Sequence, residues 1–254
     1  MKRDQFQHNG LTFSYLDEQG SGKALIALHA HWMEGLTFAP LAKALAPEWR
    51  VIALDQRGHG HSDHATTYSR EDYLVDVEAL FNHLNLKDAA LLGNSLGGIN
   101  AYQFAARHPN LVKALIIEDI GAEVSGDLSF VLEWQGTFPT KEALIERIGP
   151  RLSPYLQDFF LHDSNGWKVA FEPKDMVASQ NLTNGDHWAE WLVGSCPTLL
   201  IRGEDSRVTN AEHLEEMARR RPNTRFLSLK GGHVVHVDNP AGFEDAVKTF
   251  LHAL

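Results

Sequence analysis

Six short, unbroken apolar runs constrain the fold of this chain more than any other feature. They lie at residues 24–29, 50–55, 89–93, 113–119, 197–202 and 224–229. Uninterrupted runs of this length are typical of strands that are buried on both faces, as in a parallel sheet. Between the runs, apolar residues recur at helical spacing, for example in residues 69–84, 96–108 and 240–254. This alternation predicts an α/β fold, with a mostly parallel sheet flanked by helices.

Two segments depart from the alternation. Residues 5–20 alternate apolar and polar side chains across Asn9-Gly10, which predicts a hairpin at the start of the chain. Residues 121–191 look mostly helical and contain four of the six tryptophans. We expect this segment to be an insertion lying over one edge of the sheet. Most of its aromatic side chains should pack the insertion onto the sheet, and a few should line a pocket.

We expect a soluble cytoplasmic protein. Of its 254 residues, 43% are apolar, and the formal net charge is −10. An acidic surface repels phosphate backbones, so we expect no nucleic-acid partner. No stretch has the length and apolarity of a membrane span or a secretory signal. Cys196 is the single cysteine, so no internal disulfide forms, and we expect it to be a small buried apolar residue.

A glycine-flanked serine stands between an apolar run and a helix. Gly93-Asn-Ser-Leu-Gly-Gly98 fits the G-x-S-x-G pattern in the strand–turn–helix context that this pattern requires. A sharp turn there exposes the hydroxyl of Ser95 at the carboxyl edge of the sheet, and the helix that begins at Leu96 points its positive end toward it. The pattern alone is weak, because chance matches are common. It predicts a nucleophile only if a base and donors for an oxyanion accompany it.

Candidate partners occur at two other strand ends. His233 follows Lys230-Gly-Gly232 after the last apolar run, where it could take the proton of Ser95. His236 is a competing base, and we favour His233 because it directly follows the glycines. The run 24–29 ends in His29-Ala-His-Trp32, and the backbone N–H groups of His31 and Leu96 are the expected oxyanion donors.

Together these motifs resemble the α/β-hydrolase superfamily. The residues that carry the resemblance are His29-Ala-His-Trp32, Asp55-Gln-Arg-Gly-His-Gly-His-Ser62, Gly93–Gly98 and Gly231-Gly-His-Val-Val-His-Val-Asp-Asn-Pro240. The resemblance implies an eight-stranded sheet, a helical cap after strand six, a Ser–acid–His triad and no cofactor. Residues 1–120 and 192–254 would form the core domain and residues 121–191 the cap. Ala30 departs from the glycine that many members carry, which narrows this loop.

The acid of the implied triad has two candidates. Most members place it after strand seven, three residues beyond a glycine, but Ser206 occupies that position here and Asp205 comes one residue early. A shift of one residue turns a side chain to the other side of a strand end. Asp119 ends the run 113–119, and the chain resembles a subgroup of small esterases with the acid there and a serine in the later loop. We therefore favour Asp119 over Asp205 as the partner of His233.

The expected activity is hydrolysis of a carboxylic ester with a small to medium acyl group. Lactone hydrolysis, amide or imino-peptide cleavage, carbon–carbon bond hydrolysis and acyl transfer use the same triad and stay open. The expected partner is a small acyl substrate, with no membrane partner, and a homodimer is left open.

Two remoter alternatives come from different classes of protein. His59-Gly-His-Ser-Asp-His64 matches a dinuclear zinc pattern, which would leave the Ser95 turn and His233 unexplained. A small-molecule receptor on the same scaffold is the other, because a fold does not fix a function.

Overall fold

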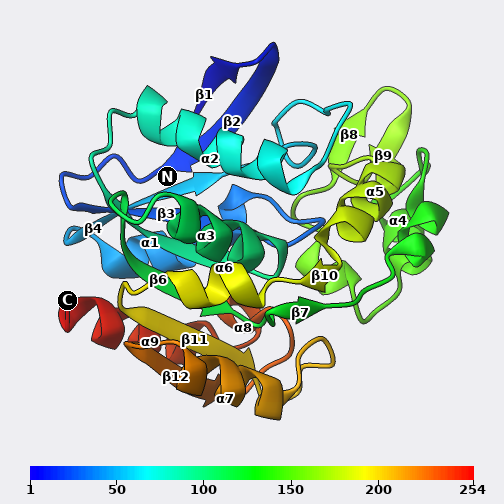
Figure 1. The fold of residues 1–254 in the computed structure, drawn as a ribbon. Helices are drawn as coiled ribbons and strands as arrows, with labels where there is room; N and C mark the ends of the chain where they lie inside the picture. The colour runs from blue at the N-terminus through cyan, green and yellow to red at the C-terminus, as the bar shows by residue number, and fades with distance from the viewer.

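An eight-stranded sheet runs through the centre of the computed structural model, which describes residues 1–254 (Figure 1). Its strand order is β1-β2-β4-β3-β5-β6-β11-β12. The strands are β1 (Lys2–His8), β2 (Leu11–Asp17), β3 (Lys23–Leu28), β4 (Trp49–Leu54), β5 (Ala89–Asn94), β6 (Val112–Glu118), β11 (Thr198–Gly203) and β12 (Thr224–Leu229). Strand β2 is antiparallel to β1 and β4, and every other pair in the sheet is parallel. The predicted α/β class with a mostly parallel sheet is thus confirmed.

The middle residues of the central strands are apolar because both faces of the sheet are covered. In β3, Ile26 and Leu28 face one core cluster, whereas Leu25 and Ala27 face the other. All four residues are fully buried. Alternate side chains of a strand point to opposite faces, so only a continuous apolar run can fill both cores.

Helices cover the two faces in separate sets. One core cluster joins the sheet to α2 (Arg70–His83), α3 (Leu96–Arg107), α6 (Trp188–Val193) and α7 (Ala211–Arg220). The other joins it to η1 (Gly35–Phe38), α1 (Ala39–Leu45), α8 (Val235–Asp238) and α9 (Pro240–His252). Two local signals account for the ends of elements. Ser69 and Asp72 form a capping box at the start of α2, and Asn9 and Gly10 turn the chain between β1 and β2 with positive φ.

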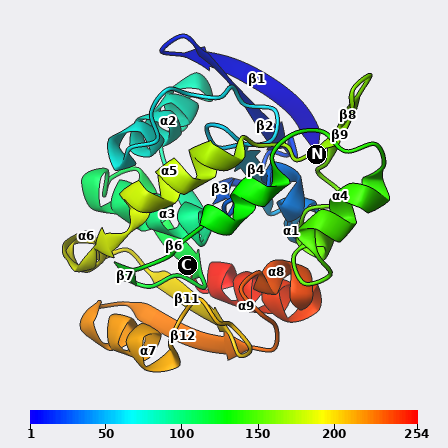
Figure 2. The ribbon, with the colours of Figure 1, turned by 90° about the vertical axis from the view of Figure 1, so that its right-hand side faces the viewer.

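Residues 121–191 contain both helices and short strands. Helical elements are η2 (Ser129–Trp134), α4 (Lys141–Ile148), η3 (Ser153–Tyr155) and α5 (Pro173–Thr183). Two small pairs accompany them: β7 (Glu123–Val124) with β10 (Gly185–Asp186), and β8 (Leu161–Asp163) with β9 (Gly166–Lys168). Figure 1 places α4, α5, β8 and β9 to the right of the sheet, and Figure 2 views α4 and α5 from their own side. Trp134, Met176 and their neighbours give this segment an apolar cluster of its own. None of the helices combines the length and the apolarity needed to cross a membrane.

Candidate active site

The predicted site residues lie at the carboxyl ends of neighbouring parallel strands. His31 lies in the loop that follows β3, Ser95 directly follows β5, and Asp119 directly follows β6. His233 lies in the loop after β12, at the same edge of the sheet. In parallel strands these ends share one edge, where ligands of open α/β sheets bind.

Ser95 occupies a strained turn between β5 and α3. Its φ of 52° and ψ of −116° lie outside the ordinary regions for a residue with a side chain. A Cβ atom at Gly93 would collide with the carbonyl of Gly97, and one at Gly97 would collide with the carbonyl of Leu28. The two glycines therefore permit the close contact that this turn requires. The Ser95 N–H donates to the carbonyl of Glu118 (3.0 Å), which holds the turn against β6.

The carboxylate of Asp119 is fully buried and accepts four hydrogen bonds. Oδ1 accepts from the N–H of Gly203 (3.1 Å) and from the hydroxyl of Thr209 (2.8 Å). Oδ2 accepts from the hydroxyl of Ser206 (2.5 Å) and lies 2.7 Å from Nδ1 of His233. Donors on all sides fix the orientation of the carboxylate. Asp119 is thus held at one angle toward the ring of His233.

The ring of His233 has one nitrogen engaged and one free. Nδ1 carries its proton toward Asp119, while Nε2 has no partner in the protein. The amide of Asn94 donates to the carbonyl of His233 (3.1 Å) and so ties the His233 loop to the strand that precedes Ser95. A carboxylate on Nδ1 leaves the lone pair of Nε2 available to accept a proton.

The competing candidates are engaged elsewhere or lie apart. Both ring nitrogens of His236 have partners, with Nδ1 at 2.8 Å from Glu118 Oε2 and Nε2 at 2.7 Å from the hydroxyl of Thr37. Asp205 is exposed, and its carboxylate bonds to no other side chain. Of the four candidates for base and acid, the structure therefore brings together His233 and Asp119.

The loop after β3 is held by its own buried histidine. His29 donates from Nδ1 to the carbonyl of Ala30 (2.7 Å), and Nε2 accepts the N–H of Gln56 (3.0 Å). Burial lowers the pKa of His29 to about 4, so the ring is neutral near pH 7. Burial also lowers the pKa of His31 well below its ordinary value, and His31 Nε2 lies 2.9 Å from the hydroxyl of Ser179 in α5. The N–H of His31 makes no hydrogen bond, and that of Leu96 lies at the unpaired start of α3.

An apolar cluster lies beside these groups. It joins Ala30 and Met33, from the loop that contains His31, to Val234, which directly follows His233. Tyr155 and Phe159 from the 121–191 segment pack against it. Apolar walls next to a few oriented polar groups are typical of pockets for small organic molecules.

The histidines of the zinc-like pattern do not form a metal site. No group of three or more His, Cys, Asp or Glu side chains is arranged to hold an ion. His59 is buried against the ring of His29 (5.0 Å between centroids), whereas the side chain of His64 is exposed and lies 3.3 Å from Asp175. The structure thus separates residues that the sequence places side by side.

Three polar contacts at the site were missed by the sequence analysis. They are the Ser206 bond to Asp119, the Glu118–His236 pair behind it, and the His31–Ser179 contact with α5. Ser206 had a signal, because it occupies the position where the resemblance implied the acid. The other two join residues that are distant in sequence and match no motif.

Comparisons with known proteins identify the family. The model of the alpha/beta hydrolase fold matches residues 23–240. The 2-(acetamidomethylene)succinate hydrolase of Mesorhizobium japonicum is 27% identical over 257 residues, which covers 93% of this chain and 90% of the relative. The sn-1-specific diacylglycerol lipase ABHD11 of Mus musculus is 27% identical over 267 residues, covering 95% and 85%.

A solved structure agrees with this match. The crystal structure of E-2-(acetamidomethylene)succinate hydrolase superposes with a TM-score of 0.89, at 24% identity over 99% of both chains. At that sequence identity, the structural similarity supports the fold alone. With the family match over most of its length, the chain belongs to the alpha/beta hydrolase fold family and is a hydrolase.

Proposed function

We propose that this protein is a serine hydrolase that cleaves a carboxylic ester with a small to medium acyl group. The observation that carries the proposal is the 2.7 Å contact between Asp119 Oδ2 and His233 Nδ1, which leaves Nε2 unpartnered in the loop facing the Ser95 edge of the sheet. A serine hydroxyl is a weak nucleophile until such a base takes its proton.

The proposed reaction has two halves. Ser95 attacks the acyl carbonyl while His233 takes its proton and Asp119 stabilises the imidazolium. The N–H groups of His31 and Leu96 stabilise the oxyanion, and His233 then protonates the leaving alcohol. Water repeats the sequence on the acyl-enzyme and releases the acid. The same machinery would cleave lactones or amides, so substrates of these classes belong in the first assays.

The acyl group would pack against the apolar cluster beside His31. Ala30 and Val234 line it from the sheet side, and Phe159 from the 121–191 segment, which we propose acts as the cap. A methyl group at Ala30 shortens the space next to the oxyanion donors, in keeping with a small to medium acyl chain.

Covalent labelling tests the nucleophile directly. A fluorophosphonate should modify wild type at one site per chain, and peptide mapping should place the adduct on Ser95. The Ser95→Ala variant should take no label and lose ester hydrolysis by at least about 10⁴-fold. A folded wild type that neither labels nor turns over esters would contradict the proposal and favour a binding protein on this scaffold.

A further inference from the structure

We propose that Arg70 binds a carboxylate of the substrate, so that the ester hydrolysed at Ser95 carries an anionic group. The inference rests on the proposed function, because it names the substrate class of that same site. Arg70 is the first residue of α2 and is half-buried beneath α5.

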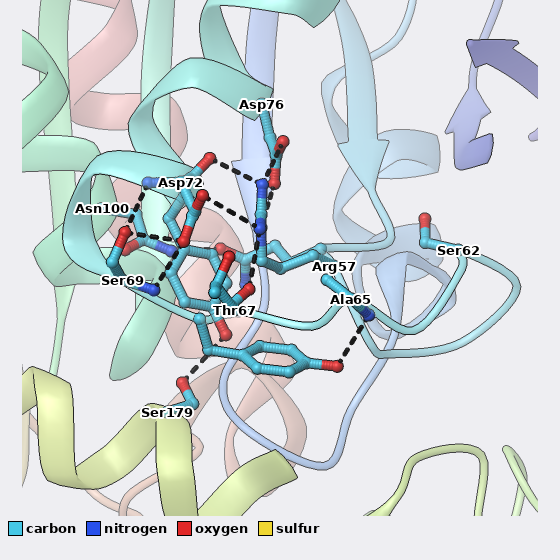
Figure 3. A network of polar contacts seen from close by, with 12 residues as sticks. Arg57, Ser62, Ala65, Thr67, Ser69, Asp72, Asp76, Asn100 and Ser179 are labelled. Atoms are coloured by element: carbon cyan, nitrogen blue, oxygen red, sulfur yellow. Dashed lines mark hydrogen bonds and ion pairs between the residues drawn. The ribbon is translucent and has the colours of Figure 1, made fainter. Parts of the chain in front are cut away.

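Two arginines flank the ring of Tyr73, and only one has an acidic partner. The guanidinium carbons of Arg57 and Arg70 lie 5.8 Å and 5.4 Å from the ring centroid. Arg57 donates to both oxygens of Asp76 (2.6 and 2.8 Å) and lies 3.4 Å from Asp72 (Figure 3). Arg70 has no carboxylate within 4.0 Å, although the chain has ten more acidic than basic side chains.

The hydrogen bonds that orient Arg70 all go to neutral oxygens, and none goes to a carboxylate. Nε donates to Gln103 (2.9 Å), Nη1 to Thr183 (3.4 Å), and Nη2 to the side-chain oxygen of Asn100. A guanidinium has five N–H donors, so these three bonds leave capacity for a bidentate carboxylate. Burial lowers the pKa of Arg70, and the charge of Glu190 in α6, which forms no ion pair with Arg70, opposes this shift without cancelling it.

The guanidinium lies close to the reacting edge of the sheet. Asn100 is five residues beyond Ser95 along α3, about 7.5 Å of helix rise. Tyr73 packs against Leu96, which directly follows Ser95. A carboxylate held by Arg70 would therefore lie on the side of Ser95 where α2 and α3 meet.

A chain of polar contacts connects this place with the loop of the expected oxyanion donor. The Tyr73 hydroxyl lies 2.9 Å from the hydroxyl of Ser179, which lies 2.9 Å from Nε2 of His31. Figure 3 shows Ser179 and Asn100 approaching the network from different elements. The polar side of the site thus lies between α2, α3 and α5, apart from the apolar cluster around Met33.

Another arginine without an acidic partner shows the contrast. Arg221 donates to the carbonyl of Trp191 (2.6 Å) and to the sulfur of Cys196 (3.4 Å). It is 1% exposed, so no solute can reach it, and its place is in the core. Arg70 differs because it stays partly accessible and lies next to the site.

Matched ester pairs test the proposal. Monoethyl succinate and ethyl 4-methylpentanoate have the same acyl outline, with a carboxylate replaced by an isopropyl group. O-butyrylglycolate and isobutyl butyrate make the same exchange on the alcohol side. In at least one pair, wild type should prefer the anionic member. Arg70→Gln should lower kcat/KM for that member by about 30- to 100-fold and for its neutral partner by less than about 3-fold.

Two controls separate recognition from general damage. Arg107→Gln removes an equal charge from the surface of α3, where Arg107 pairs with Glu71. In each ester pair, it should leave the ratio of kcat/KM for the anionic member to kcat/KM for the neutral member unchanged. Arg70→Lys keeps the positive charge but cannot donate two parallel hydrogen bonds to a carboxylate. Its kcat/KM for the anionic ester should lie between the values of wild type and Arg70→Gln. If Arg70→Gln does not fold, a protection experiment replaces it. Succinate or glutarate should slow fluorophosphonate labelling of Ser95 in wild type, and this protection should be weaker in Arg70→Lys.

Failure of this proposal is distinguishable from failure of the proposed function. Hydrolysis of neutral esters that requires Ser95, without preference for either anionic member, overturns the role of Arg70 and keeps the serine mechanism. If Arg70→Gln lowers kcat/KM equally for the anionic and the neutral member of each pair, the role of Arg70 in carboxylate binding is also overturned. A structural role, or a role in stabilising the oxyanion, would lower kcat/KM for both members. Hydrolysis that survives in Ser95→Ala removes the basis of both proposals.

Discussion

At the scale of single residues, the identity of the acid is the sharpest question. Asp119 is buried under four donors and lies 2.7 Å from His233, whereas Asp205 is exposed. We expect Asp119→Asn to lower kcat by about 10³- to 10⁴-fold, because an amide no longer favours the required tautomer of His233. Steady-state kinetics on aryl esters of graded acyl length would measure the loss.

Asp205→Asn is the matched control for that substitution. It removes the same charge one residue from Ser206 and should leave kcat within about twofold. A dead Asp205→Asn beside an active Asp119→Asn would refute the assignment.

The sequence indicated these residues because each one follows a strand end in a motif. Glycines around Ser95 and before His233 are needed for local backbone geometry, so short-range patterns expose them. Arg70 and Glu118 had no such signal. Arg70 looks like an ordinary helix-start residue, and the lack of an acid near it becomes visible only when α2, α3 and α5 are assembled.

At the scale of elements, a buried pair fixes the short helix α8 that follows His233. Glu118 at the end of β6 is fully buried and accepts from both the N–H (2.9 Å) and Nδ1 (2.8 Å) of His236. Thr37 from η1 meets the other ring nitrogen. The pair therefore joins β6, η1 and α8 next to the sheet edge that carries Ser95 and Asp119.

Glu118→Gln should loosen this junction. Weakening a buried pair on one side costs about 3 kcal/mol, so we expect Tm to fall by roughly 6–12 °C. Because α8 positions His233, kcat should fall more than KM rises. Differential scanning fluorimetry and ester kinetics would measure both effects.

A surface pair provides the control for Glu118→Gln. Glu48 lies 2.8 Å from His252, with both side chains more than half exposed. Glu48→Gln should change Tm by no more than about 2 °C, because exposed pairs contribute little. Equal shifts in the two variants would argue against a special role of the buried pair.

The long elements were predictable and the short ones were not. The six runs agree with β3, β4, β5, β6, β11 and β12 to within about one residue. In the inner strands, burial on both faces demands apolar residues. The expectation of burial on both faces is wrong for β12, an edge strand in which Arg225 and Ser228 are exposed. Residues 121–191 were expected to be mostly helical. Strands of two or three residues, such as β7 and β8, are too short to show a period of two, and their pairing depends on the surrounding tertiary structure.

At the scale of the whole molecule, the burial of three imidazole rings at one edge of the sheet makes the free energy of unfolding depend on pH. His29, His31 and His59 lie together there, and burial lowers the pKa of each. Two buried carboxyls act in the opposite direction. Burial raises the pKa of Glu34 to about 7 and that of Asp76 to about 6, so the folded state keeps protons that the unfolded chain releases.

These opposing groups make a comparison with a variant more informative than the wild-type curve. His59 is 1% exposed, its Nε2 has no partner, and its Nδ1 donates only to the carbonyl of Arg57 (2.9 Å). His59→Leu therefore removes the ring at the cost of one hydrogen bond, a loss that does not vary with pH. Below its ordinary pKa of about 6.5, the unfolded chain binds a proton at this position and the folded protein does not. As the pH falls, the free energy of unfolding of wild type therefore decreases by up to about 1.4 kcal/mol per pH unit because of this ring, and the variant lacks this decrease. Between pH 7 and pH 5, the free energy of unfolding of His59→Leu should rise by about 2 kcal/mol relative to wild type, as measured by urea unfolding. A constant difference across that range would mean that His59 titrates alike in both states, and would refute the predicted shift.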